Sequence, residues 1–449
     1  MQKPILILIF FFFHYMAIGQ TIVHRDTVIE NMVKEVSADS LQSYINTLVN
    51  VGTRNTLSKQ TVAGKGIAAA RNYVLLKFNE FAKHSGGRMT AMIDTTTIAA
   101  DGKRINAPTL LGNVMAVLHG TDSNDKRIFM ISGHLDSRAS DVMNSTIDAP
   151  GANDDGSGVA AVMECARIMS QQSFPATIIF VAVSGEEQGL LGSGFLAKKA
   201  MQKGWQLEAL LNNDIMGSNN SNETNIIDNT RLRVFSEGLP AFELDKRAAN
   251  IRNLGLENDG NARQLARYVK ESGERYVDNL EVVLIYRNDR FLRGGDHTPF
   301  VQNGFAAVRI TEMNENYNRQ HQDVRLEKNI QYGDLPAFID KEYLRKNTAV
   351  NLATLANLAS APSVPQAVKV DVKNLSNRTV LHWMPPLTGK ESGYYVLIRE
   401  TTSPVWQKKI FTNQLQMTLP FSKDNYFFAV QSVSEHGNES LAIVPLADK

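Results

Sequence analysis

The chain has 449 residues, of which 43% are hydrophobic and 21% charged, an ordinary globular composition that excludes wholesale disorder. Lys and Arg number 47 against 46 Asp and Glu, and the resulting net charge of +1 offers no global field for nucleic acid or an anionic membrane. The single cysteine, Cys165, excludes an internal disulfide framework and a cysteine-based zinc cluster.

The first nineteen residues are typical of an export signal. Lys3 precedes an apolar stretch from Pro4 to Ile18, and Ala17 and Gly19 place small residues where a signal peptidase reads them. A membrane-spanning helix needs about 20 apolar residues, more than this stretch provides. We therefore predict cleavage near Gly19, a mature protein with no integral membrane segment, and a location in the periplasm or the extracellular medium.

From residue 20 to 361, helical periodicities alternate with short apolar or β-branched runs. Such alternation is typical of crossover units, so we predict an α/β domain with a mostly parallel sheet and helices on both faces. The predicted helices are 40–51, 65–81, 158–170, 194–202 and 260–272. The predicted strands are 88–93, 114–119, 127–132, 177–183, 208–211, 282–286 and 306–310.

The sequence pattern changes after a short linker at residues 359–365, which is rich in small residues and contains proline. Prolines then punctuate short alternating runs, among them 367–372, 380–383, 394–398 and 426–433, with turn signals about every ten residues. This pattern predicts a β-sandwich over residues 362–449.

Four short segments place acidic residues or a histidine just after a predicted strand or in a Gly-rich loop that opens a helix. Acidic residues in loops are usually solvated, so one such pair would carry little weight. Four in order are different, because ligands of open parallel sheets bind at the carboxyl ends of the strands. The segments carry His134 and Asp136, Asp154 and Asp155, Glu186 and Glu187, and Asp214.

Two later histidines, His297 in RGGDHTPF and His321 in YNRQHQDVR, are further candidates. A site with histidine, several carboxylates and no thiolate suits Zn²⁺, and Co²⁺ or Mn²⁺ fit the same ligands. Several carboxylates around one point repel one another unless cations lie between them. Two metal ions bridged by a carboxylate and a hydroxide would remove that repulsion and form a hydrolytic site.

The ordered set GHLDS, GANDDGSG, SGEEQGLLGS, NNDIMG, GDHTPF and YNRQHQD resembles the secreted di-zinc aminopeptidases of metallopeptidase clan MH, the bacterial leucyl aminopeptidase-like enzymes. The resemblance covers roughly residues 119–323 and implies a three-layer α/β/α sandwich around a mixed sheet, with two zinc ions. It implies that His134 and Asp214 bind one metal, that Glu187 and His321 bind the other, that Asp154 bridges both, that Glu186 is the general base, and that Asp136 orients His134.

The resemblance favours His321 over His297 as the ligand, because the family's SDHxPF segment borders the pocket and the ligand histidine comes later. Here His321 is followed by Gln322 and Asp323, an HxD spacing where the family has one resembling HxxD. Some relatives also carry an aromatic hydroxyl near this segment that helps to stabilise the oxyanion. The matching stretch DRFLRGGDH has none, which leaves Arg290, Arg293 and the more distant Tyr286 as substitutes.

Residues Pro362 to Pro445 resemble a fibronectin type III domain, with Trp383 as the inter-sheet core tryptophan and Tyr426 as the tyrosine of a sandwich corner. Nothing in this segment indicates catalysis. We expect it to act as a spacer or stabiliser, or to contact proteins or glycans. In the preceding domain, Cys165 is expected in the core and Asp155 as a helix cap.

Together these features predict an exported zinc-dependent aminopeptidase that uses a two-metal-bound hydroxide and acts on peptides, with no nucleic-acid partner. A related di-zinc carboxypeptidase or dipeptidase is one alternative, because Arg290 and Arg293 could bind a substrate carboxylate. A glutaminyl cyclase, which uses one zinc, is another. The last is a non-catalytic binding protein on the same scaffold, which would be expected to lack ligands or the base.

Overall fold

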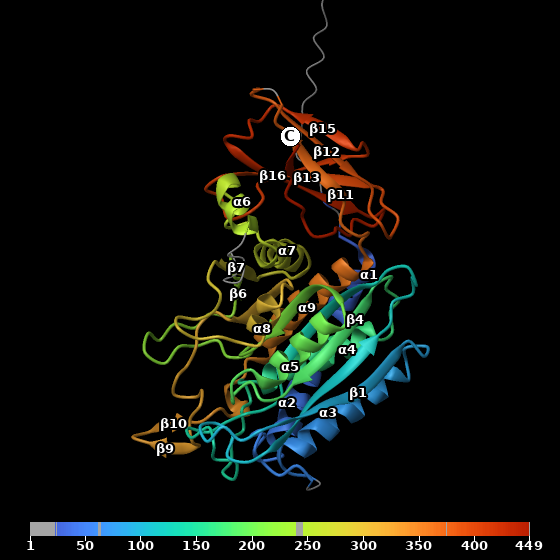
Figure 1. Cartoon of the computed structure of the whole chain (residues 1–449). Coiled ribbons are helices and arrows are strands. Elements are labelled where there is room, and N and C mark those ends of the chain that lie inside the picture. The colour runs from blue at the N-terminus through green and yellow to red at the C-terminus, as the bar shows by residue number, and fades with distance from the viewer. Residues whose placement is uncertain (1–22, 24, 62–63, 239–245, 374, 449) are drawn as a thin grey trace, which may run out of the picture.

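A computed structural model describes residues 23, 25–61, 64–238, 246–373 and 375–448 (Figure 1). The predicted export signal lies outside these residues. The described chain consists of an α/β part and a C-terminal all-β part, which confirms the predicted fold class. None of the helices in the described ranges is both long enough and apolar enough to span a membrane.

Eight strands form one sheet in the order β1-β2-β4-β3-β5-β8-β6-β7. The neighbouring pairs β4–β3, β3–β5, β5–β8 and β6–β7 are parallel, and the other three pairs are antiparallel. The mixed, mostly parallel sheet predicted from the sequence is therefore confirmed. Its strands are β1 (Met89–Ile98), β2 (Thr109–Leu118), β3 (Arg127–His134), β4 (Thr177–Val183), β5 (Gln206–Asn213), β6 (Arg231–Phe235), β7 (Glu281–Ile285) and β8 (Ala307–Glu312).

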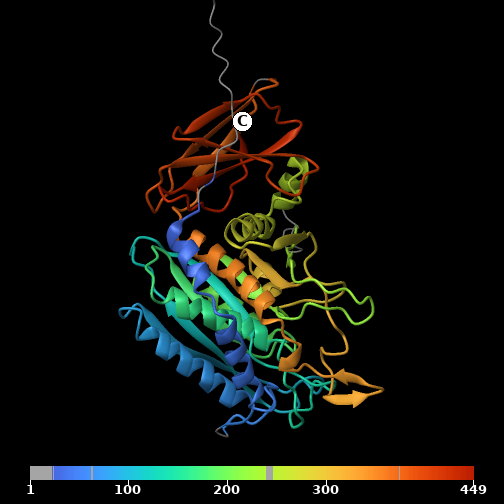
Figure 2. The same ribbon diagram turned by 180° about the vertical axis from the view of Figure 1, so that it is seen from behind.

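Helices cover both faces of this sheet (Figures 1 and 2). Helices α4 and α9 contact the central strands on one face, with α2 and α3 against α4 and with α1 and α7 against α9, whereas α5 and α8 lie on the other face. The helices are α1 (Thr27–Lys34), α2 (Ala38–Val49), α3 (Gly66–Ala82), α4 (Gly156–Met169), α5 (Leu191–Gln202), α6 (Lys246–Leu254), α7 (Asn261–Tyr276), α8 (His297–Gln302) and α9 (Lys341–Ser360).

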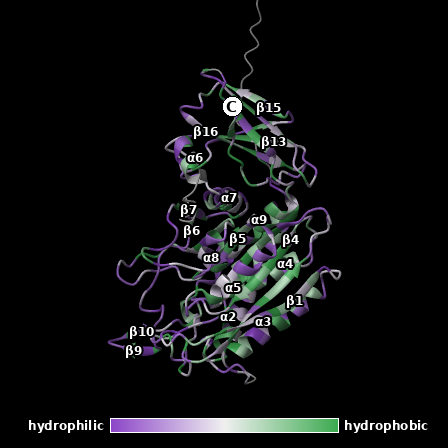
Figure 3. Ribbon diagram, viewed as in Figure 1, coloured by the Kyte–Doolittle hydropathy of each residue, from purple (hydrophilic) through white to green (hydrophobic). Residues whose placement is uncertain are grey.

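Two apolar layers hold the helices to the sheet. In β3, Phe129 and Ile131 belong to the cluster under α4 and α9, while Met130 between them belongs to the smaller cluster under α5 and α8. This alternation follows from the two-residue period of a strand. The central strands are apolar on both sides, as buried parallel strands are, and Figure 3 shows hydrophobic residues along β4 and α4 and hydrophilic ones at the β9–β10 hairpin (Arg325–Glu327 and Ile330–Tyr332).

Helix α9 lies outside every helix predicted from the sequence, although it has 20 residues. It contacts α1, α2, α4 and α7 as well as β3 and β4, so nearly all of its side chains are buried. A helix buried on all sides shows no polar stripe, and the periodicity that identifies an amphipathic helix is absent. Its buried amides bond inward, as where Asn351 Nδ2 donates to Asn213 Oδ1 at 2.7 Å. The short elements α1, α8, β6 and β9–β10 were also not predicted.

The C-terminal part contains seven strands in two sheets, β15-β12-β11-β17 and β14-β13-β16. Trp383 is buried between them and meets the Tyr394 ring edge-on, with 5.4 Å between the ring centroids. Tyr426 packs against Phe421 at 5.3 Å. The strands are β11 (Gln366–Asp371), β12 (Thr379–Met384), β13 (Gly393–Glu400), β14 (Lys408–Thr412), β15 (Gln416–Leu419), β16 (Tyr426–Val433) and β17 (Leu446–Asp448).

Buried charges join the two parts of the molecule. Glu439 lies in the segment after β16. Its carboxylate accepts two hydrogen bonds from Arg275 of α7, at 2.6 and 2.9 Å, and one from Asn357 of α9, at 2.8 Å. Lys409 of β14 lies 3.2 Å from the same carboxylate. A second cluster joins Asp259 to Arg267 and to Arg399 of β13, with distances of 3.1 and 2.5 Å.

Candidate metal centre

The histidine and acidic side chains identified in the sequence converge at one edge of the sheet. Strands β4, β3, β5 and β8 are adjacent and mutually parallel, so their carboxyl ends lie together. The connections that leave this edge carry the candidate residues. His134 ends β3, Asp154 lies in the loop before α4, Glu186 and Glu187 follow β4, Asp214 follows β5, and His321 lies between β8 and β9.

His134 is held with its Nε2 atom facing the other candidates. Its Nδ1 atom lies 3.0 Å from the backbone carbonyl of Asp136, whereas the Asp136 carboxylate is 3.9 Å away. Since a carbonyl only accepts, Nδ1 carries a proton, so Nε2 is the ring nitrogen that could bind a metal ion. The contact of Asp136 with the ring, which the resemblance implied, is therefore made by its backbone carbonyl and not by its carboxylate.

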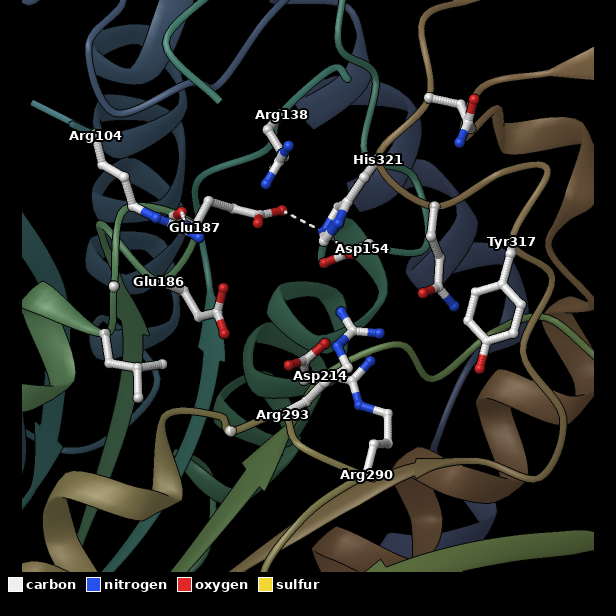
Figure 4. A pocket seen from close by; sticks show the side chains of 15 residues that line it. Arg104, Arg138, Asp154, Glu186, Glu187, Asp214, Arg290, Arg293, Tyr317 and His321 are labelled. Carbon is white, nitrogen blue, oxygen red and sulfur yellow. Dashed lines mark hydrogen bonds and ion pairs between the residues drawn. The ribbon is translucent and has the colours of Figure 1, made fainter. Parts of the chain in front are cut away.

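The Asp136 carboxylate instead organises the loop after β4. It accepts hydrogen bonds from the backbone N–H groups of Gly185, Glu186 and Glu187 at 2.8, 3.2 and 3.1 Å. Three donors on one buried carboxylate fix the path of that loop. This arrangement lets adjacent residues take different directions, with Glu187 beside His321 and Glu186 facing the open pocket (Figure 4).

Asp154 lies at the centre of the cluster. Its Oδ1 is 3.0 Å from His134 Nε2, and its Oδ2 is 3.1 Å from His321 Nε2. The peptide bond to Asp155 is cis. The backbone N–H of Asp154 donates to the Asp334 carboxylate at 2.7 Å. This hydrogen bond joins residues 180 positions apart and helps to hold the loop in place.

Asp155 caps α4, which confirms the role predicted for it. Its side chain accepts from the N–H of Gly158 at 2.9 Å in the first turn of the helix. It also accepts from the N–H of His134 at 2.8 Å and of Ile215 at 3.2 Å. One buried carboxylate thus ties together β3, α4 and the end of β5, and Cys165 lies buried further along the same helix, as predicted.

Asp214 and Glu187 complete the two sides of the cluster. Asp214 Oδ1 lies 3.8 Å from His134 Nε2, and its Oδ2 pairs with the buried Arg309 of β8 at 3.0 Å. Glu187 Oε1 lies 3.1 Å from His321 Nε2 (Figure 4). One oxygen of Asp214 is therefore paired with the Arg309 guanidinium, and the other faces the His134 imidazole.

His321 and His297 occupy different environments. His321 has a φ of +53°, an unusual backbone conformation that places its ring beside Asp154 and Glu187. His297 begins α8, is fully buried, and its Nε2 lies 2.7 Å from the carbonyl of Asn288. Of the two histidines, only His321 is within reach of the described carboxylate cluster.

Two groups of side chains could each hold a metal ion, and Asp154 belongs to both. One consists of His134, Asp154 and Asp214, the other of Asp154, Glu187 and His321, with ligand atoms within 4.8 Å of one another in each. An imidazole lone pair facing a carboxylate oxygen at 3 Å is repulsive unless a proton or a metal ion lies between them. The nitrogen and oxygen donors, with no thiolate, fit zinc.

The charges of the cluster show the same need for cations. Burial opposes a charge on His321, but the carboxylates of Glu187 and Asp154 raise its pKa to about 10. Burial raises the pKa of Glu186, and the neighbouring carboxylates of Glu187 and Asp214 raise it further, against the attraction of His134. Without a metal ion, protons supply the missing positive charge, and a metal ion would displace them from the imidazoles.

The cluster forms the floor of a pocket of about 690 Å³. Glu186 faces this space from one wall, and four arginines also line it: Arg104, Arg138, Arg290 and Arg293 (Figure 4). The sequence had pointed only to Arg290 and Arg293. The remaining lining residues are Gly189, Leu190, Gly294, Tyr317, Gln320 and Gln322.

The tertiary structure also reveals supporting residues that sequence reasoning missed. Arg54 is fully buried and donates to the carbonyls of Leu135, Pro150 and Gly151 at 2.8, 2.5 and 2.7 Å. No local sequence signal distinguishes Arg54 from a surface arginine.

Tyr286, considered as a substitute oxyanion donor, points away from the pocket and donates to the Pro404 carbonyl of the C-terminal part at 2.5 Å.

Comparison with known proteins agrees with this geometry. The model of peptidase family M28 matches residues 113–340, about half of the chain. The chain belongs to peptidase family M28. It is 41% identical to a probable zinc metalloprotease of Leptosphaeria maculans over 96% of this chain and 99% of that protein. A probable zinc metalloprotease of Pyrenophora tritici-repentis is 39% identical over 94% of this chain and 87% of that protein.

Solved structures of this fold include two from Legionella pneumophila. The LapA aminopeptidase matches with a TM-score of 0.53 at 18% identity, over 76% of this chain and 78% of that one. LapB matches with a TM-score of 0.51 at 17% identity, over 76% and 77%. At such identities the likeness establishes the fold. Family membership and the two groups of donors together support a zinc-dependent hydrolase of the M28 type.

Proposed function

We propose that this M28 peptidase is an exopeptidase that removes residues from the N-terminus of peptides with two zinc ions. The observation that carries the proposal is the position of Asp154, whose two oxygens face two different histidines. A carboxylate shared in this way suits a bridging ligand, with His134 and Asp214 on one ion and Glu187 and His321 on the other. The N-terminal direction follows from the motifs shared with the di-zinc aminopeptidases.

Glu186 is the proposed general base and proton carrier. It lies next to a proposed ligand but its side chain faces the pocket, so it is free to exchange protons with a substrate (Figure 4). When bound, zinc would polarise the scissile carbonyl and lower the pKa of the attacking water. Glu186 would take the proton of that water and deliver it to the leaving amine nitrogen. Asp136 acts as a positioning residue, through His134 and the loop that carries Glu186.

A carboxypeptidase or dipeptidase is the second candidate, since Arg290 and Arg293 line the pocket where a substrate's terminal carboxylate could bind. Such an enzyme would use the same zinc ligands and the same base. It would differ only in which end of the peptide enters the pocket.

We also propose export and a division into domains. Removal of residues 1–19 would leave one mature chain. It would consist of a peptidase domain of residues 20–361 and a fibronectin type III-like domain of residues 362–449. The end of α9 at Ser360 and the start of β11 at Gln366 support this boundary. N-terminal sequencing of the protein recovered outside the cytoplasm would test the cleavage site, and an intact Met1 would contradict it.

The test of the activity combines two measurements on one purified sample. Metal per chain would be determined by elemental analysis, and a mixed peptide library would be followed by mass spectrometry with and without a chelator. Two zinc ions with chelator-sensitive loss of N-terminal residues are expected. Loss of C-terminal residues would select the second candidate, and one metal or none without cleavage would contradict both.

A further inference from the structure

We propose that the pocket selects substrates bearing a carboxylate in addition to the scissile peptide bond. This inference deepens the proposed peptidase function and rests on it. Its basis is the charge of the pocket wall, where four arginines face the proposed zinc site. The carboxylate could come from an acidic side chain beside the scissile bond or from the C-terminus of a short peptide, and both present the same planar anion to a guanidinium.

Two of these arginines have no acidic partner among the described residues. Arg104 donates to the backbone carbonyl of Glu187 at 2.5 Å, and Arg138 donates to the carbonyls of Ala139 and Ser140 at 3.0 and 2.6 Å. Neither guanidinium forms an ion pair with a carboxylate in the described part of the chain. Carbonyl contacts hold the two side chains in place but leave their charges uncompensated.

On the opposite side, Arg293 has only a distant acidic partner. Arg290 pairs with Asp289 at 3.2 Å and with Glu315 at 3.1 Å, and Glu315 also pairs with Arg233 at 2.8 Å. Arg293 approaches the same carboxylate only to 3.8 Å, and 36% of its side chain is exposed. Arg290 is a buried structural cation, whereas Arg293 is a surplus cation at the edge of the pocket.

The acids of the pocket cannot balance the arginines once metal is bound. Asp154, Glu187 and Asp214 are the proposed ligands, so their charge is used in holding zinc. Glu186 is then one carboxylate for Arg104, Arg138 and Arg293. The wall then retains positive charge from Arg104, which donates to the Glu187 carbonyl, and from Arg138 and Arg293, which line the same pocket (Figure 4). A guanidinium that binds a carboxylate through two hydrogen bonds gains both affinity and orientation.

The experiment uses peptides that differ in one charge. Glu-Ala-Ala-amide is compared with Gln-Ala-Ala-amide, and Ala-Glu-Ala-amide with Ala-Gln-Ala-amide, which isolates a side-chain carboxylate at either position. Ala-Ala is compared with Ala-Ala-amide, which isolates the C-terminal carboxylate. In at least one pair the acid is expected to have a kcat/KM about tenfold or more above its neutral partner, and the ratio should fall as salt is added.

Variants assign the effect to the arginines. Arg138→Gln and Arg293→Gln are each expected to reduce the acid-to-neutral ratio toward one, mainly through KM. Arg378→Gln is the matched control, because Arg378 is exposed on the C-terminal part, away from the pocket. Binding of L-glutamate and L-glutamine is measured in parallel by calorimetry, and glutamate should bind more tightly to the unmodified protein but not to an arginine variant.

The outcomes separate this inference from the proposed activity. Cleavage of all peptides with equal kcat/KM in every pair would overturn the carboxylate preference while leaving the exopeptidase intact. Arginine-dependent preference for glutamate without any cleavage would support the carboxylate pocket and contradict the exopeptidase. A preference for the acidic peptides that persists in both arginine variants would overturn the assignment of this preference to Arg138 and Arg293.

Discussion

At the scale of single residues, the centre depends on buried carboxylates that are not themselves proposed ligands. Asp136, Asp155 and Asp334 each accept backbone N–H groups from neighbouring loops, at 2.7 to 3.2 Å. Because loops lack the regular hydrogen bonds of helices and strands, these acceptors replace them and hold the proposed ligands in register.

Glu186→Gln should leave the metal content unchanged and lower kcat by about 10²–10⁴-fold, because the amide cannot accept the proton. Glu187→Gln is the matched control. Glu187 is a proposed zinc ligand, so the same substitution at this position should lower the zinc content. Elemental analysis and steady-state kinetics on both variants would check this. Full activity of Glu186→Gln would contradict the assignment of the base.

Arg54→Met should destabilise the loops that carry Asp136 and Asp154. Three buried carbonyl groups would lose their donor, which at about 1 kcal/mol or more each amounts to roughly 3 kcal/mol of unfolding free energy. Denaturant unfolding and zinc affinity would both be measured. Arg378→Met, at an exposed position, should change neither, and an equal effect of the two substitutions would refute a special role for Arg54.

At the scale of elements, the site depends on the close approach of β3 to the start of α4. A Cβ on Gly133 would lie 2.6 Å from the backbone carbon of Gly158, so only glycine permits this contact. The short distance lets Asp155, at the N-cap of α4, receive the N–H of His134 at the end of β3. Small residues here thus set the spacing of two proposed site segments.

Gly133→Ala should therefore cost about 1–3 kcal/mol of stability and weaken zinc binding, because backbone must move to admit the methyl group. Gly194→Ala is the control: nothing lies within 4 Å of its added Cβ, and α5 should gain up to about 1 kcal/mol. Thermal unfolding with zinc titration would compare them. A neutral Gly133→Ala would mean that α4 can shift without disturbing the site.

At the scale of the whole molecule, the C-terminal part is joined to the peptidase by buried ion pairs rather than by a flexible tether. Glu439 contacts residues of α7, α9 and β14 and so connects both parts through one carboxylate. Burial opposes its ionisation, but Lys409 and Arg275 hold the pKa of Glu439 well below its usual value. We therefore expect the all-β part to stabilise the α/β part.

Glu439→Gln should lower the unfolding free energy by about 3–5 kcal/mol at neutral pH, because it removes the carboxylate that pairs with the buried Arg275 guanidinium. The carboxylate has a lower pKa in the folded state, so its contribution is present above the unfolded value of about 4.3 and is lost as pH falls below it. The difference between wild type and variant should thus shrink toward pH 3, measured on chelator-treated protein. Glu435→Gln, where 75% of the side chain is exposed, should stay near zero throughout, and a difference that grows in acid would contradict this account.

Local sequence patterns were enough to predict the fold class and most of the candidate site residues. Strand β4 is apolar from its second residue to its end, and the His134, Asp154, Glu186–Glu187 and Asp214 segments follow local signals at strand ends. These features depend on near neighbours in the chain, so pattern alone identifies them.

Contacts between residues far apart in the chain could not be predicted in this way. Helix α9 is buried on all sides and has no periodicity to detect. Arg54, Arg104 and Asp334 have no local signal because their partners lie 80 or more residues away. The proximity of His321 rather than His297 to Asp154 likewise depends on how the segment after β8 folds back. Packing of remote segments, not local propensity, sets these contacts.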